Sequence, residues 1–383
     1  MMTQSKKMSK ASYAQIVWAL FMLLPSTSVS TPIIDVHVHT STSYFGPLLK
    51  LLGSYGISRY VNLSGGFGER LVDSLEAAAP LEPQVAVCTN IDWSNINGPD
   101  FSSQTRRALE RAKALGARCI KISKALGLYI TVKDSNQGER LLELDDPRLN
   151  EIWSTAGRLR LPIFIHTGDP KAFFEPLTPE NERYHELSLH PDWSFYGPQF
   201  PSRDDLLEAR SRVFAQHPTT QFIAVHFANN PEDLDYVDRL LSRYPNVCVD
   251  LAARLPEIGR HPPRLVREVF IRHQKRILFG TDLGFSPRQI MLGSVGENKP
   301  VLHDIFEFYA VHERWLTSND RAMPHPTPIQ GNWTIDAIAL PPAVLENIYW
   351  RNALRVIWHS QPDAEQEERL LMDVPSMSVY YPN

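Results

Sequence analysis

The 383-residue sequence lacks the features of two large protein classes, the disulfide-rich proteins and the strongly basic nucleic-acid-binding proteins. It holds three cysteines, and each falls within a predicted strand, where free cysteine behaves as a small buried apolar residue. We therefore expect no disulfide framework, and we place Cys88, Cys119 and Cys248 in the core without a catalytic role. The chain has no long basic run, and 39 Lys and Arg against 43 Asp and Glu give a net charge of −4. This balance argues against nucleic acid as a main partner.

An apolar segment near the N-terminus, residues 16–24, is too short to span a bilayer, so we expect no stable membrane span. Three lysines precede this segment, and Pro25 and a series of small residues ending at Ser30 follow it. This order matches a secretory signal and predicts export to the periplasm or the extracellular space after cleavage near Ser30. A leader helix packed beneath the folded domain is the alternative interpretation.

Short apolar, β-branched runs alternate with longer amphipathic runs along most of the chain. The 43% of hydrophobic residues can form a large core, and α/β barrels often exceed 250 residues as a single unit. Eight strand–helix units with right-handed crossovers predict a closed (β/α)8 TIM barrel. We expect strands at 33–39, 60–65, 85–91, 119–123, 162–167, 221–227, 247–252 and 276–281. We expect helices near 47–56, 67–79, 103–115, 147–160, 203–217, 232–244, 262–274 and 302–316, with an extra C-terminal helix at 341–357.

The chain therefore divides into three parts. Residues 1–30 form the expected signal peptide, residues 31–360 the barrel domain, and residues 361–383 a C-terminal tail. The tail begins acidic and then becomes hydrophobic. It could bind another subunit of a homo-oligomer.

The first predicted strand alternates apolar residues with one acid and two histidines. Successive side chains of a strand point to opposite faces, so Asp35, His37 and His39 are expected on one face. Two neighbouring imidazoles pack poorly in a core, but neutral imidazole is a common ligand for zinc and similar ions. The pair therefore indicates half of a divalent-metal site.

Polar residues also end three later apolar strands. His166 ends the fifth strand, His226 the sixth, and Asp282 follows the eighth. The carboxyl ends of barrel strands face the active site, so these side chains should converge with the first pair. Taken singly, His166 could be a hydrogen-bonded core histidine and Asp282 a helix cap.

These residues resemble the metal-dependent amidohydrolase superfamily, and specifically the amidohydrolase-related group that also contains aminocarboxymuconate-semialdehyde-type decarboxylases. The resemblance extends from about Ile33 to Ile357. It is carried by Asp35–His39, Pro162–Pro170, Val225-His226, Phe279–Asp282 and Asn347–Val356.

The resemblance implies roles for the converging residues. His37, His39 and His166 would bind one divalent ion, which we expect to be zinc, with Asp282 as the fourth ligand. Asp282 would also take a proton from the attacking water and return it to the leaving group. His226 would polarise the substrate carbonyl, and Asp35 would orient a histidine or anchor the strand.

Lys121 has three interpretations. It alternates with isoleucines in the fourth strand and should point into the barrel. Binuclear members of the superfamily use a carboxylated lysine here, which would imply a second ion and make His226 a metal ligand. Lys121 could instead bind a substrate carboxylate, or be a structural lysine paired with a buried acid.

The connection after the fifth strand, residues 168–201, is long enough to be a functional lid. Its aromatic residues could line a pocket for a planar or apolar substrate, or could fold the loop onto itself or form a subunit contact. Tyr184, His185 and Trp193 are its candidate substrate-binding residues. Arg254, after the seventh strand, could bind an anionic group or be a solvated surface charge.

We therefore expect a metal-dependent hydrolase that acts on an amide, lactone or ester bond of a small molecule. A non-oxidative decarboxylase with the same ligands is the first alternative. A non-catalytic metal-binding protein is the second.

Overall fold

The computed structural model describes residues 32–134, 138–286 and 288–360. The expected signal peptide and C-terminal tail lie outside these residues. No helix in the described part of the chain is long and apolar enough to cross a membrane.

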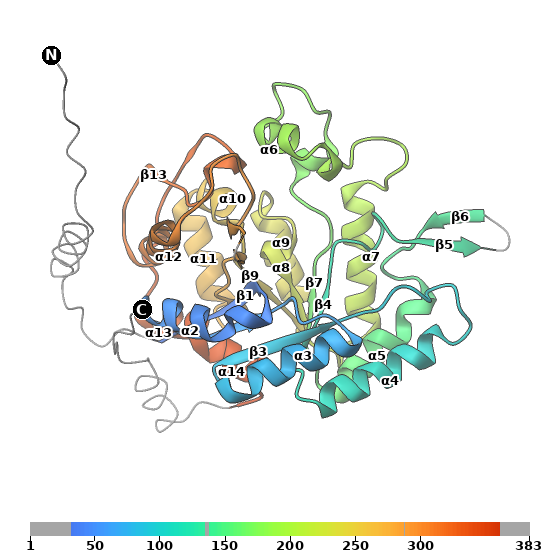
Figure 1. Ribbon diagram of the computed structural model, residues 1–383. Coiled ribbons are helices and arrows are strands. Elements are labelled where there is room, and N and C mark those ends of the chain that lie inside the picture. The colour runs from blue at the N-terminus through green and yellow to red at the C-terminus, as the bar shows by residue number, and fades with distance from the viewer. Residues whose placement is uncertain (1–31, 135–137, 287, 361–383) are drawn as a thin grey trace, which may run out of the picture. The chain divides into compact units, whose positions relative to one another are not determined.

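A parallel sheet curls into the barrel at the centre of Figure 1, with neighbouring strands following chain order. All eight predicted strands are present within the described residues, so this prediction of the fold is confirmed. They are β1 (Ile33–Thr40), β2 (Ile57–Asn62), β3 (Val85–Asn90), β4 (Cys119–Ile122), β7 (Ile163–Ile165), β8 (Phe222–Ala224), β9 (Val247–Asp250) and β10 (Ile277–Leu278).

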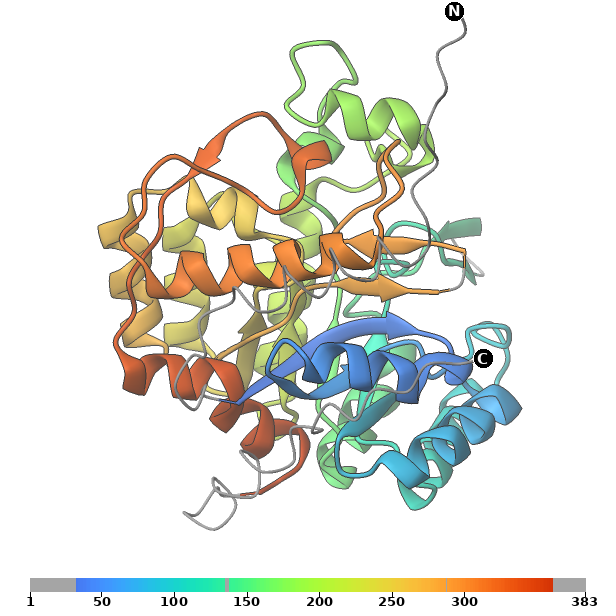
Figure 2. The ribbon, with the colours of Figure 1, turned by 60° about the vertical axis from the view of Figure 1, so that its left-hand side comes forward.

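A bend in the last strand closes the barrel. β10 pairs with β9, and the chain then bends at Asp282, whose φ is 64°, before β11 (Leu283–Phe285) pairs in parallel with β1. The Val36 amide donates to the Phe279 carbonyl at 3.0 Å, and the Asp282 amide donates to the His37 carbonyl at 2.9 Å. Figure 2 shows the blue β1 beside the orange segment that contains β11. This closure brings Asp282 next to the first strand.

Helices pack outside the strands because each presents one apolar stripe to the sheet, and the eight predicted helices are all present (Figure 1). They are α2 (Phe45–Gly53), α3 (Gly68–Ala78), α4 (Phe101–Ala114), α5 (Asn150–Leu159), α7 (Arg203–Gln216), α9 (Leu234–Arg243), α11 (Pro263–Arg272) and α12 (Leu302–Thr317). The extra C-terminal helix comprises α13 (Pro342–Glu346), a π-helical turn at Asn347–Arg351, and α14 (Asn352–Ile357).

Several short elements in the loops were not predicted. They are the hairpin of β5 (Thr131–Asp134) and β6 (Gly138–Leu141), β12 (Ile290–Leu292), β13 (Met323–Pro324), β14 (Thr334–Ile335), α6 (Tyr184–Leu189), α8 (Val225–Ala228) and α10 (Leu255–Gly259). Each is too short to show a periodic pattern in the sequence.

The expectation of no disulfide is wrong for two of the three cysteines. Cys88 in β3 and Cys119 in β4 are directly opposite each other in adjacent parallel strands, with 4.3 Å between their Cα atoms, and they form a disulfide. The sequence places them 31 residues apart and does not show this register. Cys248 is free and buried, as expected.

Asp35 anchors the first strand to the bend in the last one. Its fully buried carboxylate accepts hydrogen bonds from the Thr281 hydroxyl at 2.6 Å, the Tyr309 hydroxyl at 2.6 Å and the His37 amide at 2.9 Å. Burial raises the pKa of Asp35 to about 6. These contacts agree with the expected anchoring role and place Asp35 outside the group of candidate ligands.

Candidate metal centre

Three candidate ligands converge at the carboxyl end of the barrel. The Nε2 atoms of His37 and His39 each lie 3.4 Å from the same oxygen, Oδ1 of Asp282. His37 and Asp282 also form a group with His226 in which one ligand atom from each residue lies within 4.8 Å of the others. These residues are far apart in the sequence, and barrel closure brings them together.

Neighbouring groups orient the imidazoles for metal binding. The Nδ1 atom of His37 lies 2.8 Å from Oδ2 of Asp250, and Nδ1 of His226 lies 2.8 Å from the Ala252 carbonyl. Carboxylate and carbonyl oxygens accept hydrogen bonds, so both rings carry their proton on Nδ1 and have a lone pair on Nε2. Nδ1 of His39 similarly contacts the Ser64 hydroxyl at 2.6 Å. A partner on the second nitrogen is the usual arrangement for metal-binding histidines.

His166 lies next to the same group. Its ring centroid is 4.3 Å from that of His226. Its Nε2 atom is buried and has no hydrogen-bond partner within the described residues, although Oδ1 of Asp169 lies 3.4 Å away. An unpaired buried nitrogen beside other imidazoles fits a metal ligand.

The four imidazoles are held in the neutral form, which is the form that binds metals. Burial lowers the pKa of His39 to about 3 and that of His166 to about 4, and the positive charge of Lys121 adds to the effect on both. The pKa values of His37 and His226 are also well below normal, again mainly because of burial. The donor set therefore fits a divalent ion.

Lys121 points toward this group from β4. Its Nζ atom lies 3.5 Å from Nε2 of His37, and its side chain is buried. Burial lowers its pKa to about 8, although the charges of Asp250 and Asp282 act in the opposite direction. Within the described residues no acid forms an ion pair with Lys121, which weakens the interpretation as a structural pair.

A small cavity of about 110 Å³ opens onto His166, His226 and Asp282. Two cations line it, Lys124 and Arg254, and both face Asp169, whose carboxylate lies 2.5 Å from Lys124 Nζ and 3.6 Å from Arg254. Burial alone would raise the pKa of Asp169, but Lys124, His166 and Arg254 outweigh it and hold this pKa well below normal. Arg254 is itself buried, so its interpretation as a solvated surface charge is wrong.

Of the three lid residues predicted to bind substrate, only Trp193 lines the cavity. Lys124 Nζ lies 5.3 Å from its ring centroid. Tyr184 and His185 are exposed and do not line it. They lie on the outward face of α6, which instead turns Glu186 to the cavity.

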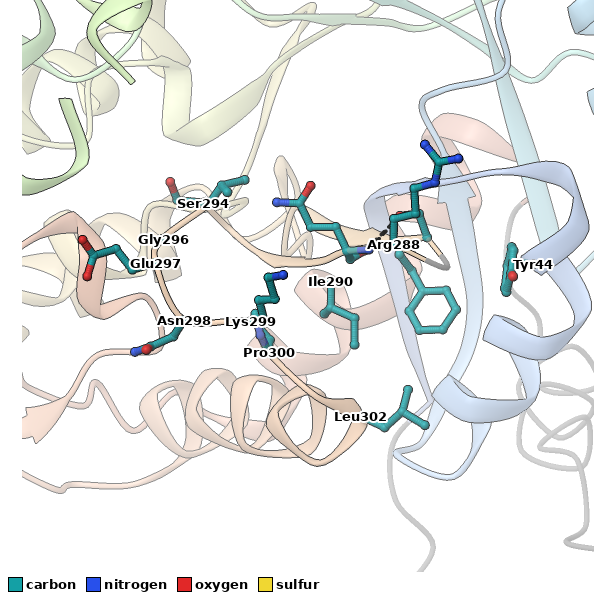
Figure 3. A pocket seen from close by; sticks show the side chains of 14 residues that line it. Tyr44, Arg288, Ile290, Ser294, Gly296, Glu297, Asn298, Lys299, Pro300 and Leu302 are labelled. Carbon is teal, nitrogen blue, oxygen red and sulfur yellow. Dashed lines mark hydrogen bonds between the residues drawn. The ribbon is translucent and has the colours of Figure 1, made fainter. Parts of the chain in front are cut away.

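A larger hollow of about 540 Å³ lies beside this cavity, along the β11–β12 hairpin and the loop that leads into α12 (Figure 3). The two share Ser294. Arg288, Lys299 and Leu302 line the hollow, but it contains none of the candidate ligands. The chemistry therefore favours the smaller cavity as the site.

Asp250, Asp169, Glu186 and Ser294 were not predicted. The sequence pattern around Asp250 is the one that pointed to Asp282: an acid directly after an apolar strand, here Val247–Val249. Asp169 and Ser294 lie in loops and Glu186 lies in the short helix α6, and the sequence there has no periodic pattern to show which side chains turn inward.

Comparison with known proteins places this geometry in a family. The model of the amidohydrolase family matches residues 34–357, which is most of the chain. The chain belongs to the amidohydrolase family. The matched range includes every candidate ligand. No curated protein matches the chain.

Solved structures similar to this chain share little sequence with it. A putative amidohydrolase from Staphylococcus aureus has 14% identity and a TM-score of 0.50, over 85% of this chain and 99% of that one. A dihydroxybenzoic acid decarboxylase from Polaromonas sp. JS666, with bound manganese and the inhibitor 2-nitroresorcinol, has 15% identity and a TM-score of 0.49, over 87% and 98%. A putative 2-pyrone-4,6-dicarboxylic acid hydrolase from Pseudomonas putida has 11% identity and a TM-score of 0.46, over 87% and 100%.

Proposed function

We propose that this member of the amidohydrolase family is a metal-dependent hydrolase that cleaves an amide, lactone or ester bond in a small molecule. The observation that carries the proposal is the approach of His37 Nε2 and His39 Nε2 to one oxygen of Asp282. His166 would complete the set, and three imidazoles with one carboxylate match the ligand preferences of zinc. A divalent ion held there supplies Lewis acidity and activates water at neutral pH.

The surrounding residues supply the remaining chemistry. The second carboxylate oxygen of Asp282 would take the proton of the attacking water and return it to the leaving group. His226 donates from Nδ1 to the Ala252 carbonyl, so its Nε2 carries a lone pair and would accept a hydrogen bond from the attacking water or from a substrate N–H or O–H group. This tautomer does not fit the role expected from the sequence, which was to polarise the substrate carbonyl. The lid residue Trp193 would exclude water from one side of the cavity.

Decarboxylation is the second candidate, because the cavity has cations that could hold a substrate carboxylate. Arg254 is buried in the cavity wall, and its Nε atom has no hydrogen-bond partner within the described residues. A guanidinium with a spare donor can bind a carboxylate, which a decarboxylase must hold. This feature is equally useful to a hydrolase that acts on an acidic substrate.

Product analysis with an Asp282→Asn variant tests the proposal. We expect turnover to fall by about 10²- to 10⁴-fold, because the amide can no longer accept the water proton.

The type of reaction is tested separately on the wild-type protein. Activity would be screened on ester, lactone, amide and carboxylic acid panels, with incorporation of ¹⁸O from water and release of CO2 as readouts. Hydrolysis requires ¹⁸O in the product. Release of CO2 without ¹⁸O would contradict hydrolysis and favour the second candidate.

We also propose that the chain is exported. The charged, apolar and small-residue order of its N-terminal segment supports this, and so does the Cys88–Cys119 disulfide, because disulfides persist in oxidising compartments. N-terminal sequencing of protein from cell fractions is expected to give a mature start near Thr31 outside the cytoplasm. Unprocessed protein confined to the cytoplasm would contradict export.

A further inference from the structure

Asp250 is a fully buried acid that contacts two of the residues at the candidate metal centre. It ends β9, and its Oδ2 atom lies 2.8 Å from Nδ1 of His37. Its Oδ1 atom accepts a hydrogen bond from the backbone amide of His226 at 2.7 Å. It also accepts a weaker one from the Ala252 amide at 3.3 Å. One carboxylate therefore links the first, sixth and seventh strands of the barrel.

The contact with His226 supports an unusual piece of backbone. His226 begins four consecutive residues with left-handed φ angles of 56°, 53°, 60° and 52°, and none of the four is glycine. Such angles are unfavourable for residues with a Cβ atom and persist only where surrounding contacts impose them. Asp250 holds the start of this turn, while the Asn229 side chain holds its end by accepting from the Thr167 amide at 2.9 Å. The turn aims the His226 ring at the other histidines.

The contact with His37 determines which ring nitrogen is available to a metal. When its carboxylate is ionised, Asp250 can only accept hydrogen bonds, and His37 then donates from Nδ1 and keeps the lone pair on Nε2. That Nε2 atom is the one that faces Asp282 at 3.4 Å. Without Asp250, the imidazole could carry its proton on Nε2, where it would block metal binding.

We propose that Asp250 is a positioning residue of the metal centre. It sets the tautomer of His37 and holds the left-handed turn that presents His226. This inference rests on the proposed metal-dependent function. It assigns to Asp250 the orientation of both His37 and His226.

An Asp250→Asn variant separates the two tasks. The amide oxygen can still accept from the His226 and Ala252 amides, which leaves the NH2 group facing Nδ1 of His37. If the side-chain amide of this variant were flipped, its NH2 group would face the backbone amide of His226, and this arrangement is unfavourable because both groups are hydrogen-bond donors. The His37 ring must then accept at Nδ1 and carry its proton on Nε2. The variant therefore keeps the turn and reverses the tautomer.

Zinc affinity of the purified full chain, measured by competition with a chromophoric chelator, is the first readout. We expect Asp250→Asn to weaken zinc binding by about 10- to 100-fold, the usual effect of losing a carboxylate partner of a ligating histidine. Asp146→Asn is the matched control, because Asp146 is also a buried acid but contacts Arg140 and Arg148 and none of the candidate ligands. Its zinc affinity should equal that of the wild type. Unchanged zinc affinity in a folded Asp250→Asn variant would overturn the proposal.

The tautomer itself can be measured on metal-free wild-type protein, which keeps the test valid if the variant does not fold. Histidine ¹⁵N chemical shifts, with the His37 signals assigned by their loss in His37→Gln, are expected to show the proton on Nδ1. A proton on Nε2 of His37 would overturn the inference. This readout needs no bound ion, so failure of the wild type to bind zinc would count against the proposed function and not against the tautomer.

Discussion

Replacing His37 and His39 together by alanine is expected to remove the bound metal and abolish turnover. The two Nε2 atoms supply half of the proposed four-ligand set, and both face the same Asp282 oxygen. Loss of a single partner behind a ligand already costs about 10- to 100-fold in metal affinity, so loss of two ligands should cost more. Metal content after dialysis against a weak chelator should fall from about one equivalent of ion per chain to none.

Exposed histidines provide the control for this experiment. His185 on the lid and His303 on α12 are both exposed and lie outside the candidate site. A His185→Ala/His303→Ala variant removes the same number of imidazoles and should keep wild-type metal content and activity. Full retention of metal by the His37→Ala/His39→Ala variant would show that these residues do not bind it.

Replacing Arg183 by leucine is expected to destabilise the protein by about 3–5 kcal/mol, because it leaves buried carboxylates without a partner. Arg183 is completely buried in the lid. Its guanidinium donates to Oε2 of Glu186 at 2.7 Å and also to Glu257 at the start of α10. The ion pairs of Arg183 with Glu186 and Glu257 therefore hold the lid against the barrel. Glu186 also accepts a hydrogen bond from the Ser294 hydroxyl.

Urea denaturation followed by tryptophan fluorescence measures this effect. Arg264→Leu is the matched control, since Arg264 is 77% exposed and pairs only with Glu268 on its own helix among the described residues. Substitutions at such surface positions usually change stability by less than about 0.5 kcal/mol. Equal unfolding midpoints for Arg183→Leu and Arg264→Leu would contradict a structural role for the buried cluster.

The barrel could be predicted because its elements are long and periodic. Apolar runs such as Phe222–Val225 and Val247–Val249 indicate buried strands, and eight strand patterns alternating with amphipathic helices leave few other architectures. The disulfide could not be predicted, because it depends on the register that places Cys88 opposite Cys119. Register between parallel strands is set by packing across the whole sheet and leaves little local signal.

The convergence of the candidate ligands could be predicted where each lies at the end of a strand. His39, His166, His226 and Asp282 all lie at or just after the carboxyl ends of predicted strands, and barrel geometry brings such positions together. The groups that orient them were harder to predict. Asp250 shows its role only through contacts with the His37 side chain and the His226 backbone amide, both more than twenty residues away in the sequence.

The lid shows the limit of reasoning from residue type. Aromatic and histidine side chains suggested Tyr184 and His185 as substrate contacts, but the short helix α6 turns both outward. The same helix turns the acid Glu186 inward, where it pairs with the buried Arg183. A buried ion pair within a loop is set by tertiary contacts, which the sequence pattern does not reveal.

Anomalous diffraction from a crystal soaked in zinc tests the central claim most directly. We expect one strong peak at the carboxyl end of the barrel, about 2.0–2.2 Å from His37 Nε2, His39 Nε2 and an oxygen of Asp282. A peak elsewhere on the molecule, with no density between these three residues, would contradict the account.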